Sequence, residues 1–308
     1  MAAAWQIHRD EVAIGRRLGG GGFGDVYEAK YRGMTVAVKL LREWQDAKSS
    51  YEFQREILFM QTVRHPNIVL FIGCGSTEAT REPFLVLEYM SKGTLCDILY
   101  GDNPLDFSHN QKIGFALDIA RGMRFLHGLN PPRIHRDLKS ANLLVSDNWV
   151  VKVSDFGLGR AVTSGQQRKT TTLLETRWSK LRWSRTPSTV TVSLLNPESE
   201  LSHRHVGTAR WCAPELRAGG EYHVSVDVFS FGILLWEIWC HRLPFDNYPF
   251  SSAAANAINK GERPPVPTDC SPIYTALMKL CWSHNPNDRP NFVHIVASLE
   301  ALQAAPAF

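Results

Sequence analysis

The spacing of apolar residues changes once along the chain, and this change limits the folds that the chain can adopt. Residues 12–19, 23–29 and 35–41 are short segments rich in β-forming residues and separated by glycines, as strands are. Further on, apolar residues recur at helical spacing over residues 108–129, and residues 224–239 are almost wholly apolar, as in a buried helix. The sequence therefore predicts an α+β fold of two lobes, the first rich in strands and the second helical.

The first lobe is expected to span residues 1–90 and to hold a five-stranded sheet with one main helix. Two more strands are predicted at residues 68–73 and 84–89, and the helix at about residues 49–63. A linker at residues 88–93 would lead into the second lobe.

The second lobe is expected to span residues 91–308 and to be helical. Two of its helices are predicted to begin at Pro272 and Pro290, because proline suits the first helical turn. A third is predicted to have Ser108 as its N-cap. A cleft between two such lobes is a usual place for a ligand.

The composition is that of an ordinary globular protein, with 44% hydrophobic and 21% charged residues among 308. No apolar run approaches the roughly 18 residues of a membrane span, so we expect no membrane insertion. The net charge of +4 comes from the stretch between Arg160 and Arg210, which holds nine Lys or Arg and three Asp or Glu. A basic excess confined to one segment does not indicate a nucleic-acid partner. The six cysteines form no C-x-x-C pair, which favours reduced thiols in the cytoplasm or the nucleus.

A glycine-rich run lies at residues 18–26, between the first two predicted strands, and contains the pattern G-x-G-x-x-G-x-V. Glycines allow a hairpin backbone to approach phosphates without a Cβ clash. The position between two strands, rather than between a strand and a helix, argues against a dinucleotide-binding fold. The alternative is a glycine-rich hairpin that binds nothing.

Lys39 ends the apolar strand segment that begins at Val36. Glu56 shares the apolar face of the predicted helix with Phe53 and Met60, and an inward carboxylate needs a partner. A buried Glu56–Lys39 pair would meet this need and aim the ammonium at phosphate oxygens. The alternatives are a solvated lysine at a strand edge and a partly exposed glutamate.

The run His135–Asn142 places a carboxylate, an ammonium and an amide in one short loop, and a second carboxylate, Asp155, follows thirteen residues later. Phosphoryl transfer from a magnesium nucleotide needs this set of groups. One acid takes a hydroxyl proton and a cation meets the charge of the moving phosphoryl group. An amide and a second acid hold the metal.

With these motifs in this order, the chain resembles the eukaryotic protein-kinase family. The matching features are the glycine loop, VAVK, Glu56, HRDLKSAN, Asp155-Phe156-Gly157, Ala213-Pro214-Glu215, Asp227 within DVFSFG and Arg289 within NDRP. They cover about Trp5 to Gln303. The opening W-x-I and the closing CWSHNPNDRP resemble the tyrosine-kinase-like group, near its Raf-like and mixed-lineage-like branches. The resemblance implies the bilobal kinase fold, with ATP and Mg²⁺ as cofactors and a protein as substrate.

The resemblance also implies a role for each matching position. Asp137 would accept the proton of the substrate hydroxyl, and Lys139 would neutralise the transferring phosphoryl group. Asn142 and Asp155 would bind magnesium. Lys39 would hold the α- and β-phosphates, with Glu56 as its anchor.

Around the base, Val26, Ala37 and Leu144 would enclose adenine, and Leu87 falls at the gatekeeper position. Backbone groups of Glu88 and Met90 would read the edge of adenine. The nucleotide-binding positions implied in this way are Leu18, Gly19, Gly21, Gly24, Val26, Ala37, Lys39, Glu88, Met90 and Leu144.

Other matching positions are expected to be structural. Glu215 and Arg289 would form a buried ion pair, Asp227 would brace the catalytic loop, and His135 would pack within the core rather than act as a base. Arg136 would order a phosphorylated activation segment, which implies an upstream kinase. The alternative is an arginine held only by structural hydrogen bonds.

Two small signals favour serine or threonine as the acceptor, namely Lys139 two residues after Asp137 and Gly207-Thr208 before Ala213-Pro214-Glu215. A dual-specificity kinase is the alternative.

The segment from Asp155 to Glu215 is long, with an excess at about residues 163–205. Three explanations compete for this excess. It is a disordered and phosphorylatable loop, a docking segment that uses Trp178 and Trp183, or an artefact such as untranslated sequence read as coding.

Two further functions were weighed against an active kinase. A nucleotide-binding scaffold without activity, like a pseudokinase, would normally lack one of Lys39, Asp137 and Asp155, and all three are present. A small-molecule phosphotransferase would lack Ala213-Pro214-Glu215 and the partner Arg289.

Overall fold

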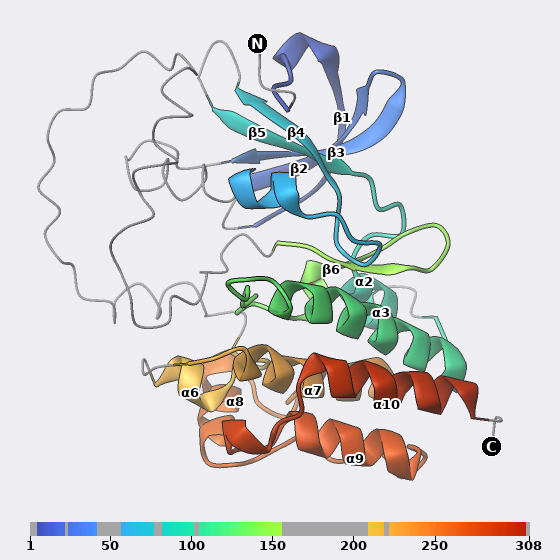
Figure 1. The fold of residues 1–308 in the computed structure, drawn as a ribbon, viewed down its shortest axis with the longest axis vertical. Coiled ribbons are helices and arrows are strands. Elements are labelled where there is room, and N and C mark those ends of the chain that lie inside the picture. Colours follow the sequence, from blue (N-terminus) through green and yellow to red (C-terminus); the bar gives the residue numbers. More distant parts are fainter. Residues whose placement is uncertain are drawn as a thin grey trace, which may run out of the picture.

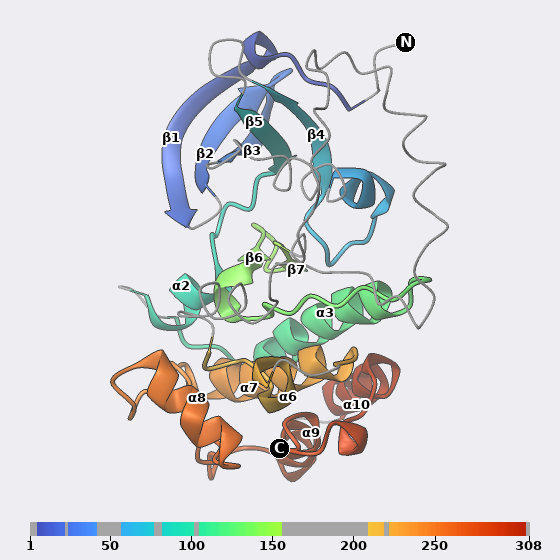
Figure 2. The same ribbon diagram turned by 90° about the vertical axis from the view of Figure 1, so that its left-hand side faces the viewer.

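The computed structural model describes residues 5–21, 24–41, 57–76, 82–101, 105–155, 209–218 and 222–305. The strands of the first lobe lie above the helices of the second (Figure 1). Two short strands, β6 and β7, lie between the sheet and the helices in both views (Figures 1 and 2). The predicted α+β fold with a β-rich lobe and a helical lobe is therefore confirmed. Its division at residue 90 stays a prediction.

The first lobe contains one antiparallel sheet of five strands in the order β1-β2-β3-β5-β4. The strands are β1 (Val12–Gly21), β2 (Gly24–Tyr31), β3 (Met34–Leu41), β4 (Phe71–Ser76) and β5 (Pro83–Glu88), and the 3-10 helix Arg9–Glu11 precedes them. Residues 57–62 are helical, in agreement with the predicted helix as far as the structure describes it.

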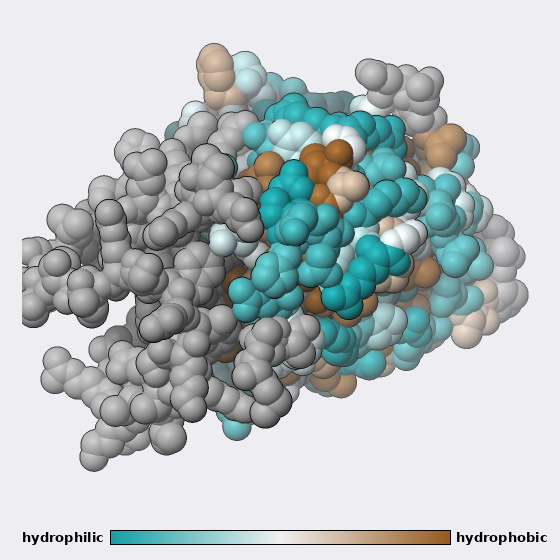
Figure 3. Space-filling model, turned by 90° about the horizontal axis from the view of Figure 1, so that it is seen from above, coloured by the Kyte–Doolittle hydropathy of each residue, from teal (hydrophilic) through white to brown (hydrophobic). Residues whose placement is uncertain are grey.

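The strand register divides the side chains of the sheet between two faces. Val26 lies opposite Lys39 and Ala37 opposite Leu87, so these four residues share one face. The other face carries a core of its own, formed by Ile7, Val12, Ala29, Tyr31, Val36, Val38, Phe84 and Val86. Seen from above, the described surface of this lobe is mostly hydrophilic (Figure 3).

The second lobe is built around α7 (Ser225–Cys240), in which almost every residue is buried. The other elements are α2 (Leu95–Tyr100), α3 (His109–His127), the 3-10 helix Ser140–Asn142, β6 (Leu143–Val145), β7 (Val151–Val153), α6 (Pro214–Arg217), α8 (Ser251–Asn259), α9 (Pro272–Cys281), the 3-10 helix Pro286–Asp288 and α10 (Phe292–Ala304). Among the described residues, no helix is long and apolar enough to cross a membrane.

Two of the three helix starts predicted from capping residues or prolines are confirmed. Ser108 caps α3 through a reciprocal capping box with Gln111, and α9 begins at Pro272. The prediction that a helix begins at Pro290 is wrong. The side chain of Asn291 accepts a hydrogen bond from the His294 amide (3.0 Å) and α10 begins at Phe292, because an asparagine N-cap satisfies a free amide. The long segment at 163–205 lies outside the described residues.

Candidate active site

The hairpin between β1 and β2 brings backbone close to the face that carries Lys39. Gly24 has φ +138, and a Cβ there would lie 1.8 Å from the Leu40 carbonyl oxygen, so this position requires glycine. Arg17 of β1 and Asp25 of β2 form an ion pair near the turn of the hairpin at 2.8 Å. Phe23, at the tip of the predicted loop, lies outside the described residues.

Lys39 Nζ lies 2.5 Å from Asp155 Oδ1. The Lys39 side chain is 12% exposed, whereas that of Asp155 is 42% exposed. Desolvation opposes ionisation of Asp155, but the Lys39 ammonium keeps the pKa of this carboxyl below its usual value. Glu56, the predicted partner of Lys39, lies outside the described residues, so that pair stays a prediction.

The loop after Arg136 gathers the other predicted groups. Asp137 Oδ2 contacts Lys139 Nζ at 3.0 Å and accepts a hydrogen bond from Asn142 Nδ2 at 2.9 Å. Asn142 Nδ2 also donates to the Asp137 carbonyl at 2.7 Å. Asp137 Oδ1 is buried and has no hydrogen-bond partner among the described residues. One oxygen is thus fixed by the loop while the other is left for a further donor.

This loop is joined directly to Asp155. The amide and the hydroxyl of Ser154 both donate to the Asn142 carbonyl at 2.9 Å. Lys139 also contributes to lowering the pKa of Asp155, so its ammonium lies near that carboxylate. Asp155 has φ 52, an unusual left-handed conformation for a residue other than glycine. Lys39, Asp137, Lys139, Asn142 and Asp155 therefore meet in one place, as predicted.

Asp227, at the start of α7, holds the same loop through hydrogen bonds to its backbone. Its carboxylate accepts hydrogen bonds from the amides of His135 and Arg136, both at 2.8 Å, and contacts His127 Nε2 at 2.8 Å. Burial opposes ionisation, but the His127 contact and the surrounding donors keep the pKa of Asp227 below its usual value. The predicted contact of Asp227 with the loop is present. His135 Nε2 lies 3.0 Å from the Ser154 carbonyl, which fits its predicted structural place.

The guanidinium of Arg136 has hydrogen-bond partners among the described residues for only some of its nitrogens. Its backbone has φ 65, and its Nη1 donates to the Tyr222 hydroxyl at 3.3 Å. Its buried Nε has no partner among the described residues. Thr208, of the Gly207-Thr208 pair noted in the sequence, lies outside the described residues.

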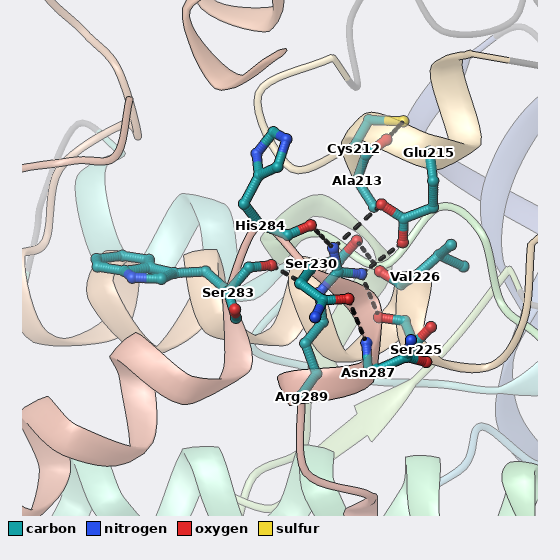
Figure 4. Close-up of polar contacts among 12 residues, drawn as sticks. Cys212, Ala213, Glu215, Ser225, Val226, Ser230, Ser283, His284, Asn287 and Arg289 are labelled. Carbon is teal, nitrogen blue, oxygen red and sulfur yellow. Dashed lines mark hydrogen bonds and ion pairs between the residues drawn. The ribbon is translucent and has the colours of Figure 1, made fainter. Parts of the chain in front are cut away.

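Glu215 and Arg289 form the predicted ion pair through two contacts, of 2.5 and 3.1 Å (Figure 4). The arginine also donates to the carbonyls of Ser283, Ser225 and His284 at 2.8, 3.0 and 3.2 Å. This pair fastens the segment that begins α6 to the loop before α10.

The residues predicted to enclose adenine come from both lobes. Val26 and Ala37 share the sheet face of Lys39, and Leu144 belongs to β6. The chain after β5 is connected to β6 by a backbone hydrogen bond, in which the Lys92 amide donates to the Val145 carbonyl at 3.1 Å. The Glu88 amide donates to the Leu70 carbonyl at 3.0 Å within the first lobe, so this amide is already used. The further positions Leu18 and Gly19 lie on β1, and Met90 follows β5.

One contact in this region was not predicted. Lys152 Nζ lies 2.7 and 2.8 Å from the two carboxylate oxygens of Glu88, and Glu88 also accepts the Leu70 amide at 2.6 Å. The contact joins β7 to the end of β5. The only signal in the sequence was a single lysine between two valines in a buried strand.

The oxygen groups of Asn142 and Asp155 fit a magnesium ion. Asn142 directs its NH₂ at Asp137, which leaves its amide oxygen for a cation. Within the described ranges, no group of three or more His, Cys, Asp or Glu side chains could hold a metal ion by itself. Magnesium commonly takes one or two protein ligands and completes its shell with phosphate and water oxygens.

Comparison with known proteins adds a family to this geometry. The model of the family described as "Protein tyrosine and serine/threonine kinase" matches residues 12–187 and 194–299. The chain is 36% identical over 299 residues to the probable serine/threonine-protein kinase drkD of Dictyostelium discoideum, which covers 97% of this chain and 20% of the relative. It is 36% identical over 304 residues to the serine/threonine/tyrosine-protein kinase HT1 of Arabidopsis thaliana, covering 96% and 67%. It is 35% identical over 297 residues to the Arabidopsis serine/threonine-protein kinase CTR1, covering 95% and 32%. The chain therefore spans between a fifth and two thirds of the length of these relatives.

Proposed function

The chain belongs to the protein tyrosine and serine/threonine kinase family, within its tyrosine-kinase-like group, and on this premise we propose that it transfers the γ-phosphate of ATP to serine or threonine hydroxyls of proteins. The observation that carries the proposal is the state of Asp137. Its Oδ2 is held by Lys139 and Asn142 while its buried Oδ1 has no partner among the described residues. An acid held in this way can receive the hydroxyl proton of an acceptor.

The other groups have roles that follow from their positions. Lys139 places a cation beside Asp137, where charge moves from the acceptor to the phosphoryl group. Lys39 and the glycine hairpin, both in the first lobe, are proposed to bind the phosphates of ATP. Lys39 can exchange its contact with Asp155 for phosphate oxygens. Asn142 and Asp155 would hold magnesium, which when bound neutralises phosphate charge.

Serine or threonine is the proposed acceptor because Lys139 contacts Asp137, the arrangement that favoured this class in the sequence. The relatives include both a serine/threonine/tyrosine kinase and serine/threonine kinases. Phosphoamino-acid analysis of a generic protein acceptor separates these cases. Phosphotyrosine alongside phosphoserine would assign dual specificity instead.

The test of activity is transfer of radiolabelled phosphate from Mg-ATP to that acceptor. Asp137→Asn keeps the shape of the side chain but removes the base, so transfer is expected to fall by at least about 100-fold. Its melting temperature should stay near that of the wild type. Equal transfer by the two proteins would overturn the proposal.

The second candidate, a scaffold that binds nucleotide without turnover, keeps one supporting fact, the long segment between Asp155 and Glu215. A thermal shift measurement with Mg-ATP, followed by the transfer assay on the same sample, distinguishes the two. Stabilisation without transfer selects the scaffold.

We further propose that an upstream kinase acts on the segment at 163–208, with Arg136 as the receiving cation. The buried Nε of Arg136, which lacks a described partner, supports this proposal. Mass spectrometry of the active protein before and after phosphatase treatment tests it. Full activity with no phosphate in this segment would remove it.

The cytoplasm or the nucleus is the proposed location. The six cysteines are all free thiols, as suits a reducing compartment. A fluorescent fusion of the full-length protein tests this, and a secreted product would contradict it.

A further inference from the structure

The turn between β6 and β7 contains a tryptophan in an unfavourable backbone conformation. Trp149 has φ 61, in the left-handed region that glycine and asparagine tolerate best. Its amide donates to the Ser146 carbonyl at 3.0 Å, and the Ser146 amide donates to the Val150 carbonyl at 3.0 Å, so hydrogen bonds close the turn. A bulky residue held in such a conformation is a reason to look for a function at this position.

The Trp149 ring connects the turn to the core of the second lobe. Its centroid lies 5.4 Å from that of the Phe107 ring and 6.3 Å from that of the Phe115 ring. Both phenylalanines are buried, whereas Trp149 is only partly buried. The indole is therefore anchored in the core and still reaches the surface.

The same ring contacts a cation from the linker at residues 88–93. Lys92 Nζ lies 4.3 Å from the centroid of the Trp149 ring, within the range of a cation–π contact. The neighbouring Ser91 hydroxyl donates to Asp147 Oδ1, in the same turn. Two consecutive side chains of the linker thus contact the turn between β6 and β7.

Backbone hydrogen bonds connect this contact to residues that are predicted to bind adenine. The Gly93 amide donates to the Met90 carbonyl at 3.1 Å, so the chain makes one turn between them, and the Gly93 carbonyl accepts the Val145 amide at 2.9 Å. Val145 directly follows Leu144 in β6. Lys92 therefore lies within the turn that begins at Met90, and this turn is bonded to the strand that carries Leu144.

We infer that Trp149 and Lys92 are positioning residues for the nucleotide, which act by fixing the turn at Met90 against β6. This inference rests on the proposed function, because it assumes that ATP binds there. Loss of the contact would leave the backbone hydrogen bonds in place but allow the turn a wider range of positions. A less preorganised site binds its ligand more weakly. Asp137 and Asp155 have no part in the contact, so transfer at saturating ATP should be unaffected.

The first test measures the dissociation constant of Mg-ADP by isothermal titration calorimetry, which requires no phosphoryl transfer. Lys92→Met keeps the length of the side chain, removes its charge and leaves the core around Trp149 intact. We expect the dissociation constant to rise by about fivefold, as the loss of one partly desolvated cation–π contact implies. Lys92→Arg keeps a cation over the ring, so its dissociation constant should stay within about twofold of the wild-type value.

The transfer assay separates positioning of the nucleotide from a general loss of structure. The KM for ATP of Lys92→Met should rise by the same factor as the dissociation constant of Mg-ADP. Its kcat and its KM for the protein acceptor should stay near those of the wild type, whereas partial unfolding would lower kcat.

A double-variant cycle tests whether the effect passes through Trp149. Trp149→Leu should weaken the binding of Mg-ADP at least as much as Lys92→Met does. In the Trp149→Leu background, Lys92→Met should cause no further loss, because the ring that it contacts is gone. If Trp149→Leu does not fold, the comparison of Lys92→Met with Lys92→Arg still decides the question.

Adenosine distinguishes positioning of the base from direct attraction of the phosphates. Because adenosine has no phosphate, its affinity for Lys92→Met should fall by the same factor as that of Mg-ADP. An ammonium that attracted the phosphates directly would affect Mg-ADP alone. Competition of adenosine with Mg-ADP in the calorimeter measures this.

Arg32→Met is the matched control. Arg32 also lies over an aromatic ring, that of Tyr31, at 5.1 Å from the centroid, but in the turn between β2 and β3. Its loss removes a similar contact that involves neither the linker nor the second lobe. The dissociation constant of Mg-ADP should therefore equal that of the wild type.

Four results would overturn the inference. The first is a Lys92→Met variant that binds Mg-ADP like the wild type, and the second is an equal loss in the Trp149→Leu background. The third is a loss for Mg-ADP without one for adenosine, and the fourth is an Arg32→Met effect as large as that of Lys92→Met. A wild type that binds no nucleotide would contradict the proposed function itself, and one that binds without transfer would contradict only the proposed transfer.

Discussion

Two ion pairs in this protein have the same shortest distance, 2.5 Å, but very different surroundings. Arg289 is 0% exposed at its side chain, contacts both oxygens of Glu215 and donates to three backbone carbonyls. Lys39 contacts one oxygen of Asp155, and that carboxylate is 42% exposed. The first pair is closed within the protein, and the second is open to a ligand.

The difference shows that distance does not reveal what an ion pair does. The guanidinium of Arg289 has exchanged water for fixed oxygens, so its loss would leave buried acceptors unpaired. The ammonium of Lys39 can leave Asp155 for phosphate oxygens, because water or a ligand can take its place there. We therefore expect one pair to support the fold and propose that the other takes part in binding a ligand.

The largest predicted effect is on the closed pair. Arg289→Met should lower the free energy of unfolding by about 3–5 kcal/mol, because it leaves Glu215 and three carbonyls without their donor. Urea unfolding followed by far-UV circular dichroism measures this change. The double variant Glu215→Leu/Arg289→Met should recover part of the loss, since it removes the unpaired carboxylate. A single-variant loss below about 1 kcal/mol would contradict the comparison.

The closed pair was expected because both partners lie in motifs that resemble those of the protein-kinase family, and the resemblance implies the pair. The contact of Asp227 with the catalytic loop was expected for the same reason, as was the gathering of Lys39 and Asp155 in one site, although their direct ion pair was not. The strands also followed from local pattern, as β2 and β3 show, since glycines and β-branched residues mark their ends and interiors.

The missed contacts join residues that are far apart in the chain and lie in no motif. Glu237 meets Tyr100 across 137 positions, and Lys152 meets Glu88 across 64. Local periodicity cannot show which distant donor will satisfy a buried acid. A signal was present nonetheless, because Glu237 is a charged residue deep inside an almost wholly apolar helix, where it must find partners.

The intermediate effect is expected at the open pair. Lys39→Met should lower the free energy of unfolding by less than Arg289→Met does, because the exposed carboxylate of Asp155 can be solvated in its place. The same variant should lose the rise in melting temperature that Mg-ATP gives the wild type. Differential scanning fluorimetry with and without Mg-ATP measures both. A variant that still responds to Mg-ATP like the wild type would show that Lys39 does not hold the nucleotide.

Lys39 should also affect how the free energy of unfolding changes with pH in acid. Its ammonium lowers the pKa of Asp155 in the folded state. A lowered pKa contributes stability above the unfolded value, and this contribution is lost as the pH falls through the folded value. Lys39→Met should therefore lose less stability than the wild type as the pH is lowered below about 4. An equal loss of unfolding free energy in the two proteins as the pH falls would contradict the effect of Lys39 on Asp155.

The smallest effect is expected at a third pair of nearly the same length. Arg242 lies 2.6 Å from Asp246, but the two side chains are 62% and 39% exposed. Solvent screens such a contact, so Arg242→Ala should leave the free energy of unfolding nearly unchanged, and raising the salt concentration should remove any difference that remains. Urea unfolding at low and high salt, beside Arg289→Met, measures it. If the exposed and the closed pair cost the same, burial and added hydrogen bonds do not set the strength of these contacts, and the distinction between the pairs fails.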